Sequence, residues 1–356
     1  MPDTTPDDSL KRSGQHADGW QHDLQPLTAF DVKAADSASK MLEQMSHTAF
    51  GGRNLGEAAD VLHEMVADEK CLVVGTFSGA MTIAKMGLLI TEMIEQGMLD
   101  IVVSTGALMC HGLIEQTGMT HFRYDPSWDD EKLYQAGYAR VYDTLELESN
   151  LDDAQAIMAQ VLAEISPDEP FGSFELNRRI GQHVAANFPG RGILPAAAAK
   201  GVPVYVPAFT DSELGIDVFL NNLLAKRAGK RPLRFEPLRD MGDYLERIER
   251  AERIGIFTIG GGVPRNWAQQ VGPLTEIIHR HTDGELGGMS RFRYAVRICP
   301  EPVHWGGLSG CTYSEGVSWG KFVSPEEGGR FAEVPCDATI AWPLLVRGVL
   351  ERMGRV

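Results

Sequence analysis

Short runs of consecutive apolar residues recur along the chain, and each ends in small residues that precede a segment with helical spacing. The first run is CLVVGT at 71–76, and apolar residues recur at helical spacing over 81–98. Apolar runs of this length are typical of strands that are buried on both faces. Runs of the same kind lie at 99–107, 202–211, 254–262, 292–299 and 333–338. The pattern predicts six strands.

Helical segments separate these runs, which indicates parallel strands joined by crossover helices. Helical spacing is present at 216–233, 237–253 and 340–353. This alternation predicts an α/β fold with a doubly wound, mainly parallel sheet that is covered by helices on both faces. We expect one domain over 29–356. Residues 1–28 are polar and aperiodic, and we expect them to form a mobile N-terminal arm.

Two polar stretches interrupt the alternation. DPSWDDEKLYQ at 125–135 is typical of a surface excursion, and ELESNLDDAQ at 146–155 is typical of a helix start. Asn150 and Asp152 are residue types that cap helix N-termini, so they are the expected caps.

The charge balance limits the classes of partner. The 356 residues include 33 Lys and Arg against 49 Asp and Glu, which gives a net charge of −16. Such a chain repels nucleic acid and anionic membranes, although this acidity is also ordinary in soluble proteins. Because no run approaches 18 apolar residues and the first residues lack an apolar signal core, we expect a cytoplasmic protein without a membrane partner.

The cysteines argue against a disulfide framework and against a zinc knuckle. They are odd in number and widely spaced, and no two form a C-x-x-C pair. The five are Cys71, Cys110, Cys299, Cys311 and Cys336. This usage suits a reducing compartment, and we expect no metal site.

Three of the predicted strands end in small hydrogen-bonding residues, where open α/β sheets bind ligands. These ends are GTFSG at 75–79, STGA at 104–107 and GGG at 260–262. Small residues let backbone N–H groups approach a phosphate, and a following helix N-terminus adds positive potential. The sequence contains neither G-x-G-x-x-G nor a P-loop here. Each strand end is therefore either part of a dinucleotide-binding site or a tight strand–helix junction. The presence of three such ends in one sheet favours dinucleotide binding.

The stretch SEGVSWGKF at 314–322 places a lysine among apolar and small residues. If the stretch is extended, Glu315, Trp319 and Lys321 share one face. If it is helical, Glu315 and Trp319 are still neighbours but Lys321 points elsewhere. A carboxylate beside an indole can hold an amine cation, and a desolvated lysine can attack an imine. The alternative is a lysine that extends from a strand end into solvent.

Several motifs, in this order along the chain, resemble the deoxyhypusine synthase family. They are TAFGGRNLGEAADVL (48–62), QGMLDIVVSTGA (96–107), PAFTDSELG (207–215), FTIGGGV (257–263), EGVSWGKF (315–322) and VPCDATIAWPLL (334–345). The resemblance spans about residues 45–350. It implies a Rossmann-like NAD-binding fold, assembled into homotetramers whose active sites lie between paired subunits.

The resemblance also implies a reaction, which is NAD-dependent aminoalkyl transfer. In the family, NAD oxidises a polyamine donor such as spermidine, a lysine captures the resulting imine, and the aminobutyl group passes to an acceptor amine. By matching position, Lys321 is the imine-forming lysine, Trp319 covers the aliphatic chain, and Glu315 binds an ammonium end.

Ten residues match cofactor-binding positions of the family. They are Ser78, Gly79 and Ala80 in a first loop, Thr105, Gly106 and Ala107 in a second, Gly261 and Gly262 in the glycine turn, and Asp211 and Asp337 elsewhere. Either aspartate would repel a ribose 2′-phosphate if it lay near that hydroxyl, so the expected cofactor is NAD.

The chain departs from the family where carboxylates hold the polyamine. Cys110 and His111 replace two glutamates of the family, and Trp305 replaces an aspartate. At the positions of two further family aspartates, this chain has Ile216 and Leu308. Fewer carboxylates predict a donor or acceptor with fewer ammonium groups.

Four residues are candidates for rebuilt substrate contacts. Asn266 takes the place of the family's histidine after the glycine turn, and Asp217 lies beside a lost aspartate. His111 and His304 are candidate new contacts, although a lone histidine is more often structural.

Three functions follow as alternatives. The leading hypothesis is an enzyme of the homospermidine synthase type, which joins small polyamine substrates. The second is a true deoxyhypusine synthase that modifies a lysine of a translation factor. The third is a non-catalytic NAD-binding protein, against which the retained Glu315, Trp319 and Lys321 argue.

Overall fold

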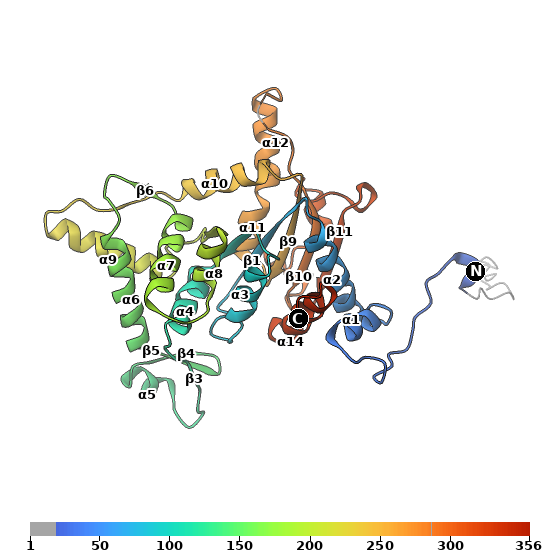
Figure 1. Cartoon of the computed structure of the whole chain (residues 1–356), viewed down its shortest axis with the longest axis horizontal. Coiled ribbons are helices and arrows are strands. Elements are labelled where there is room, and N and C mark those ends of the chain that lie inside the picture. Colours follow the sequence, from blue (N-terminus) through green and yellow to red (C-terminus); the bar gives the residue numbers. More distant parts are fainter. Residues whose placement is uncertain (1–18, 286) are drawn as a thin grey trace, which may run out of the picture.

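A six-stranded parallel sheet forms the centre of the chain (Figure 1). The computed structural model describes residues 19–285 and 287–356. The strand order is β11-β10-β9-β1-β2-β7, and all neighbours are parallel. The strands are β1 (Cys71–Phe77), β2 (Ile101–Ser104), β7 (Val204–Tyr205), β9 (Arg253–Ile259), β10 (Phe292–Ile298) and β11 (Arg330–Val334). Each predicted strand is thereby confirmed, with shifted bounds.

Successive residues of the strands enter different cores, which is why the runs are apolar throughout. In β1, Val73 belongs to one buried cluster and Val74 to the other. The first cluster receives residues of α1 (Ala38–Ser46), α2 (Phe50–Ala67), α3 (Gly87–Glu95), α4 (Gly106–Gln116), α6 (Glu148–Ala163), α7 (Ser173–Asn187), α8 (Ile193–Lys200), α9 (Glu213–Arg227) and α14 (Ala338–Arg352). The second receives residues of α10 (Leu238–Glu249), α11 (Gly262–Gln269), α12 (Val271–His281) and α13 (Tyr313–Val317). Helices therefore cover both faces, as predicted.

Small strands lie outside the main sheet. An antiparallel sheet contains β3 (Phe122–Arg123), β5 (Thr144–Leu147) and β4 (Tyr138–Val141), next to α5 (Asp130–Gln135) (Figure 1). A parallel pair is formed by β6 (Pro170–Phe171) and β8 (Arg234–Phe235). The polar stretch at 125–135 belongs to the antiparallel unit, which we call the excursion (residues 120–147).

Two predictions about local structure were wrong. Helix α6 begins at Glu148, so Asn150 and Asp152 lie inside it; Asn150 is buried, and its amide donates to Glu146 and to the carbonyl of Thr120. The helix predicted over 81–98 spans only α3, because residues 81–86 form turns in which Lys85 has a left-handed φ of 64°.

The described part of the N-terminal arm leaves the body of the molecule in an extended course (Figure 1). It contains the 3-10 turn η2 (Trp20–His22), and the side chains of Trp20 and Leu24 are exposed. Residues 1–18 lie outside the described residues, and the mobility of the arm stays a prediction. No helix among the residues described is long and apolar enough to cross a bilayer.

Candidate active site

A cavity of about 340 Å³ lies on the side of the sheet that α11 and α13 cover. Its walls come from α11, from the segment after β10 that contains η3 (Val303–Trp305), and from α13 with the turn that follows it. The polar lining residues are Arg265, Asn266, Gln269, Gln270, Cys311, Glu315 and Lys321. The structure thus brings Glu315, Trp319, Lys321 and Asn266 together in one cavity, as the sequence predicted.

Lys321 is half-buried in this cavity and is not paired with a carboxylate. Its Nζ donates to Oδ1 of Asn266 at 3.1 Å. Burial lowers the pKa of Lys321, and the nearby Arg265 guanidinium lowers it further, whereas Cys311 and Glu315 act in the opposite direction. An amine with a lowered pKa is more often neutral and therefore nucleophilic.

A turn after α13 directs Lys321 into the cavity. The amide of Lys321 donates to the carbonyl of Gly316, the amide of Gly320 donates to that of Val317, and Gly320 has a φ of 67°. This is the hydrogen-bond pattern of a Schellman motif, in which a glycine ends the helix in the left-handed region. The helical alternative is therefore correct for Glu315, but the expectation that Lys321 would then point elsewhere is wrong because the turn reverses the chain.

Aromatic packing fixes the residue that follows the lysine. Phe322 is buried, and its ring contacts those of Tyr313, Phe292 and Phe331. The backbone on both sides of Phe322 pairs with Phe292 at the start of β10. Lys321 is thus held beside the first residue of β10, a core strand.

Glu315 and Trp319 form the exposed side of the cavity. The side chain of Trp319 is 63% exposed, and Glu315 lies in the first turn of α13. An indole face and a carboxylate that are both open to solvent can receive an ammonium group.

Arg265 is a member of the cavity that the sequence prediction missed. It is 2% exposed, and its Nη2 donates to the carbonyl of Cys311 at 2.7 Å. Its guanidinium also lies 5.8 Å from the centre of the Tyr313 ring. The only sequence signal was an arginine in the first turn of the helix after the glycine run.

The three small-residue loops lie side by side, because β9, β1 and β2 are neighbours in the sheet. Ser78 Oγ donates to the carbonyl of Gly261, and Thr105 Oγ1 donates to that of Gly79 at 2.7 Å. Thr105 also caps α4. Gly79 has a φ of 70°, and a Cβ there would have nothing within 4 Å, so this loop is open to a ligand.

The glycine turn requires small residues for two reasons. Gly262 has a φ of 64°, and a Cβ on Gly261 would lie 2.5 Å from Cα of Ser309. Ala80, Gly106 and Ala107 belong to the first two loops, next to Gly79 and Thr105. The loops that precede α4 and α11 lie on either side of the loop that follows β1, and helix N-termini in this position can hold the diphosphate of a dinucleotide.

The two matched aspartates lie at opposite edges of the sheet. Asp211 follows β7, and Asp337 follows β11 and caps α14. Five strand spacings separate these edges, which corresponds to about 24 Å. The structure therefore does not bring Asp211 and Asp337 together within one chain.

Three predicted substrate contacts lie outside the cavity of this chain. Asp217 on α9 accepts from Gln155 at 3.1 Å, and burial raises its pKa. His111 on α4 contacts Glu146. His304 is exposed on η3, near the cavity but not among the residues that line it.

Comparisons with known proteins show the family of the chain. The family model for deoxyhypusine synthase matches residues 40–349. A probable deoxyhypusine synthase 2 of Methanosarcina acetivorans is 34% identical over 330 residues, which cover 92% of this chain and 90% of that protein. A deoxyhypusine synthase-like protein of Chlorobaculum parvum is 32% identical over 311 residues, with 86% and 84% covered.

A solved structure shares the fold. A crystal structure described as a deoxyhypusine synthase from Entamoeba histolytica superposes with a TM-score of 0.58 at 13% identity, covering 90% of this chain and 96% of that one. Because the family model and the relatives each cover most of the sequence, the chain belongs to the deoxyhypusine synthase family, whose members are NAD-dependent aminobutyl transferases.

Proposed function

We propose that this enzyme transfers an aminobutyl group from a polyamine donor to a small amine, through an imine on Lys321. The observation that carries the proposal is the position of Lys321 Nζ. It is half-buried, lowered in pKa, bonded to Asn266 and free of any carboxylate partner within the parts of the chain described. These are the conditions under which a lysine is a nucleophile rather than an ion-pair partner.

The cavity residues have separate roles in substrate binding and in the reaction. Glu315 receives an ammonium end of the donor, and Trp319 packs on its methylene chain. Neutral Lys321 attacks the imine carbon of the oxidised donor, forms a new imine and releases the departing amine. Asn266 holds Nζ toward the cavity until that attack. The acceptor amine then displaces Lys321 by the same exchange.

NAD, when bound, supplies the hydride acceptor that oxidises the donor and the hydride donor that reduces the product. The residues that would hold it are Ser78, Gly79, Thr105, Gly106 and Gly261, together with their loop neighbours Ala80, Ala107 and Gly262. The open, left-handed Gly79 and the close approach at Gly261 support this assignment.

The charge of the cavity favours a small amine as the acceptor. It disfavours the combination of a full polyamine donor with a protein lysine as the acceptor. Among the lining residues Glu315 is the one carboxylate, and it lies in the same lining as the guanidinium of Arg265 and the amine of Lys321. A substrate with several ammonium groups would leave most of them without an anionic partner. A second subunit that contributes further groups belongs to the same proposal, with a homotetramer as the expected assembly.

The test compares Lys321→Arg with the wild-type enzyme, given NAD, labelled spermidine and putrescine. Guanidinium keeps its charge and cannot form the imine, so we expect loss of labelled product with nearly unchanged NAD binding. Lys132→Arg, on the exposed α5, is the matched control and should retain full activity. Wild-type turnover by Lys321→Arg would mean that Lys321 is structural. Label on a translation-factor lysine instead of putrescine would favour the second alternative.

A further inference from the structure

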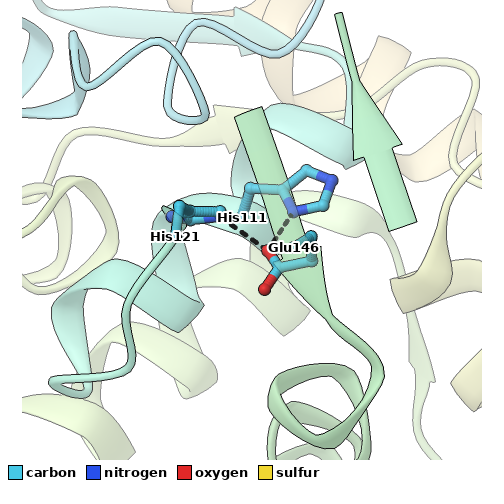
Figure 2. Close-up of side chains that lie close together, drawn as sticks. All are labelled: His111, His121 and Glu146. Carbon is cyan, nitrogen blue, oxygen red and sulfur yellow. Dashed lines mark hydrogen bonds and ion pairs between the residues drawn. The ribbon is translucent and has the colours of Figure 1, made fainter. Parts of the chain in front are cut away.

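Two histidines and a glutamate converge under the excursion, away from the Lys321 cavity. Figure 2 shows both imidazoles directed at the carboxylate of Glu146. Nδ1 of His111 lies 3.0 Å from Oε2 of Glu146, and Nε2 of His121 lies 2.6 Å from the same oxygen. The side chains of His121 and Glu146 are 0% and 1% exposed, and that of His111 is 10% exposed.

His121 Nε2 is buried without a hydrogen bond. Its contact with Glu146 is close, but it lacks hydrogen-bond geometry, so this atom has no hydrogen-bond partner in the described parts of the chain. Buried polar atoms are rarely left unsatisfied, and each exception requires a physical reason. A cation between Nε2 and the shared carboxylate oxygen would supply such a reason when the imidazole proton lies on Nδ1.

The carboxylate is held in a fixed orientation from its other side. Oε1 of Glu146 accepts from Asn150 Nδ2 at 2.7 Å and from the amide of Leu147 at 3.0 Å. Asn150 also donates to the carbonyl of Thr120, next to His121. Hydrogen bonds that orient a ligating group from behind are a general feature of metal sites.

We propose that His111, His121 and Glu146 bind a divalent transition-metal ion of the zinc class. Two imidazole nitrogens and a carboxylate are a ligand set that such ions take, with one position left for water. Ligand distances of about 2.0–2.2 Å place neighbouring tetrahedral ligand atoms roughly 3.3 Å apart. The present separations of 3.0 and 2.6 Å mean that the three side chains open slightly when the ion enters.

Lys85 sets the affinity of this site. Its Nζ lies 2.9 Å from Nδ1 of His121 and 3.3 Å from Oε1 of Glu115. A metal on Nε2 requires the imidazole proton on Nδ1, where it faces the Lys85 ammonium. Lys85 must then turn fully toward Glu115, which opposes metal binding.

The ion would join α4 to the excursion. His111 lies on α4, which starts at the cofactor loop, whereas His121 precedes β3 and Glu146 lies in β5. The site lies outside the Lys321 cavity of the same chain, and its test needs no activity measurement.

The experiment uses the full chain without a histidine tag, stripped with a chelator and titrated with Zn²⁺, and with Co²⁺ to read ligand geometry from visible absorption. We expect one ion per chain and an increase in melting temperature on binding. Glu146→Gln should bind at least about 100-fold more weakly, because a charged ligand is lost. His281→Gln removes an exposed histidine and should bind as the wild type does.

Lys85→Gln keeps all three ligands, so it tests the proposal even if Glu146→Gln folds poorly. The glutamine oxygen can accept from His121 Nδ1–H, and we expect about tenfold tighter zinc binding. Zinc binding that is substoichiometric, or equal in wild type and Glu146→Gln, would overturn the proposal. Weaker binding by Lys85→Gln would overturn the assigned ligand atoms.

Discussion

At the scale of single residues, the protonation of Lys321 decides what the cavity can do. An ammonium group would repel a cationic donor, whereas a neutral amine can attack it. The causes of the lowered pKa are burial first and then, among the charges, Arg265; Glu315 partly offsets them. Glu315 contributes its charge without an ion pair to Lys321, which leaves its carboxylate available for the substrate.

The lowered pKa predicts the pH dependence of imine formation. A base whose folded pKa is lowered is neutral over a wider range of pH, so trapping should already be efficient below the ordinary lysine value of 10.5. The measurement is the rate of borohydride trapping of the donor adduct against pH, read by mass spectrometry. A midpoint at or above 10.5 would contradict the geometry.

At the scale of elements, the Schellman turn after α13 determines where the lysine points. Gly320 occupies its left-handed position, with a φ of 67°. The sequence could have revealed this turn, because a glycine just after a short helix is its usual sign. The alternatives were left open because five helical residues are too few for periodicity to identify.

Gly320→Ala should therefore lose both stability and transfer. A Cβ in the left-handed region costs about 1–2 kcal/mol, and relaxation of the turn would move Lys321 away from Asn266. Gly201→Ala is the matched control, since Gly201 also ends a helix with a φ of 70° and has open space around it. Denaturant unfolding should show similar losses for both variants, while product formation should fall only in Gly320→Ala. Equal rates of product formation by Gly320→Ala and Gly201→Ala would show that the turn does not position the lysine.

Other elements could not be predicted because tertiary contacts decide them. Asn150 has the side chain of a capping residue, yet its buried bonds to Glu146 and Thr120 outweigh that preference. His111, His121 and Glu146 are separated in sequence without any metal-ligand spacing, so only the packing of α4 against the excursion brings them together. The strands were predictable because burial on both faces leaves an unbroken apolar run.

At the scale of the whole molecule, the sheet separates groups that the resemblance assigns to one cofactor. Asp211 and Asp337 follow its two edge strands. We expect a second subunit to supply one of them to the shared cofactor. We therefore expect no dominant monomer in sedimentation at micromolar concentration.

Mixing two inactive variants tests this arrangement. Asp211→Ala and Asp337→Ala should each lose activity, and if the two residues serve one site from different subunits, mixed dimers contain one intact site. Random exchange would then restore about a quarter of wild-type turnover. Each variant refolded with itself is the control. No recovery after verified subunit exchange would place both residues in the same chain's site.

The walls of the cavity differ in burial. Lys321 is attached to the buried Phe322 cluster and the start of β10, whereas Val303, Trp305 and Leu308 are exposed on the segment that closes the opposite wall. Substitutions in that segment meet solvent more than core, so they cost little stability. In the proposed mechanism, mutation of this segment can therefore change which amine enters while the chemistry at Lys321 persists, so that selectivity can evolve independently of the nucleophile.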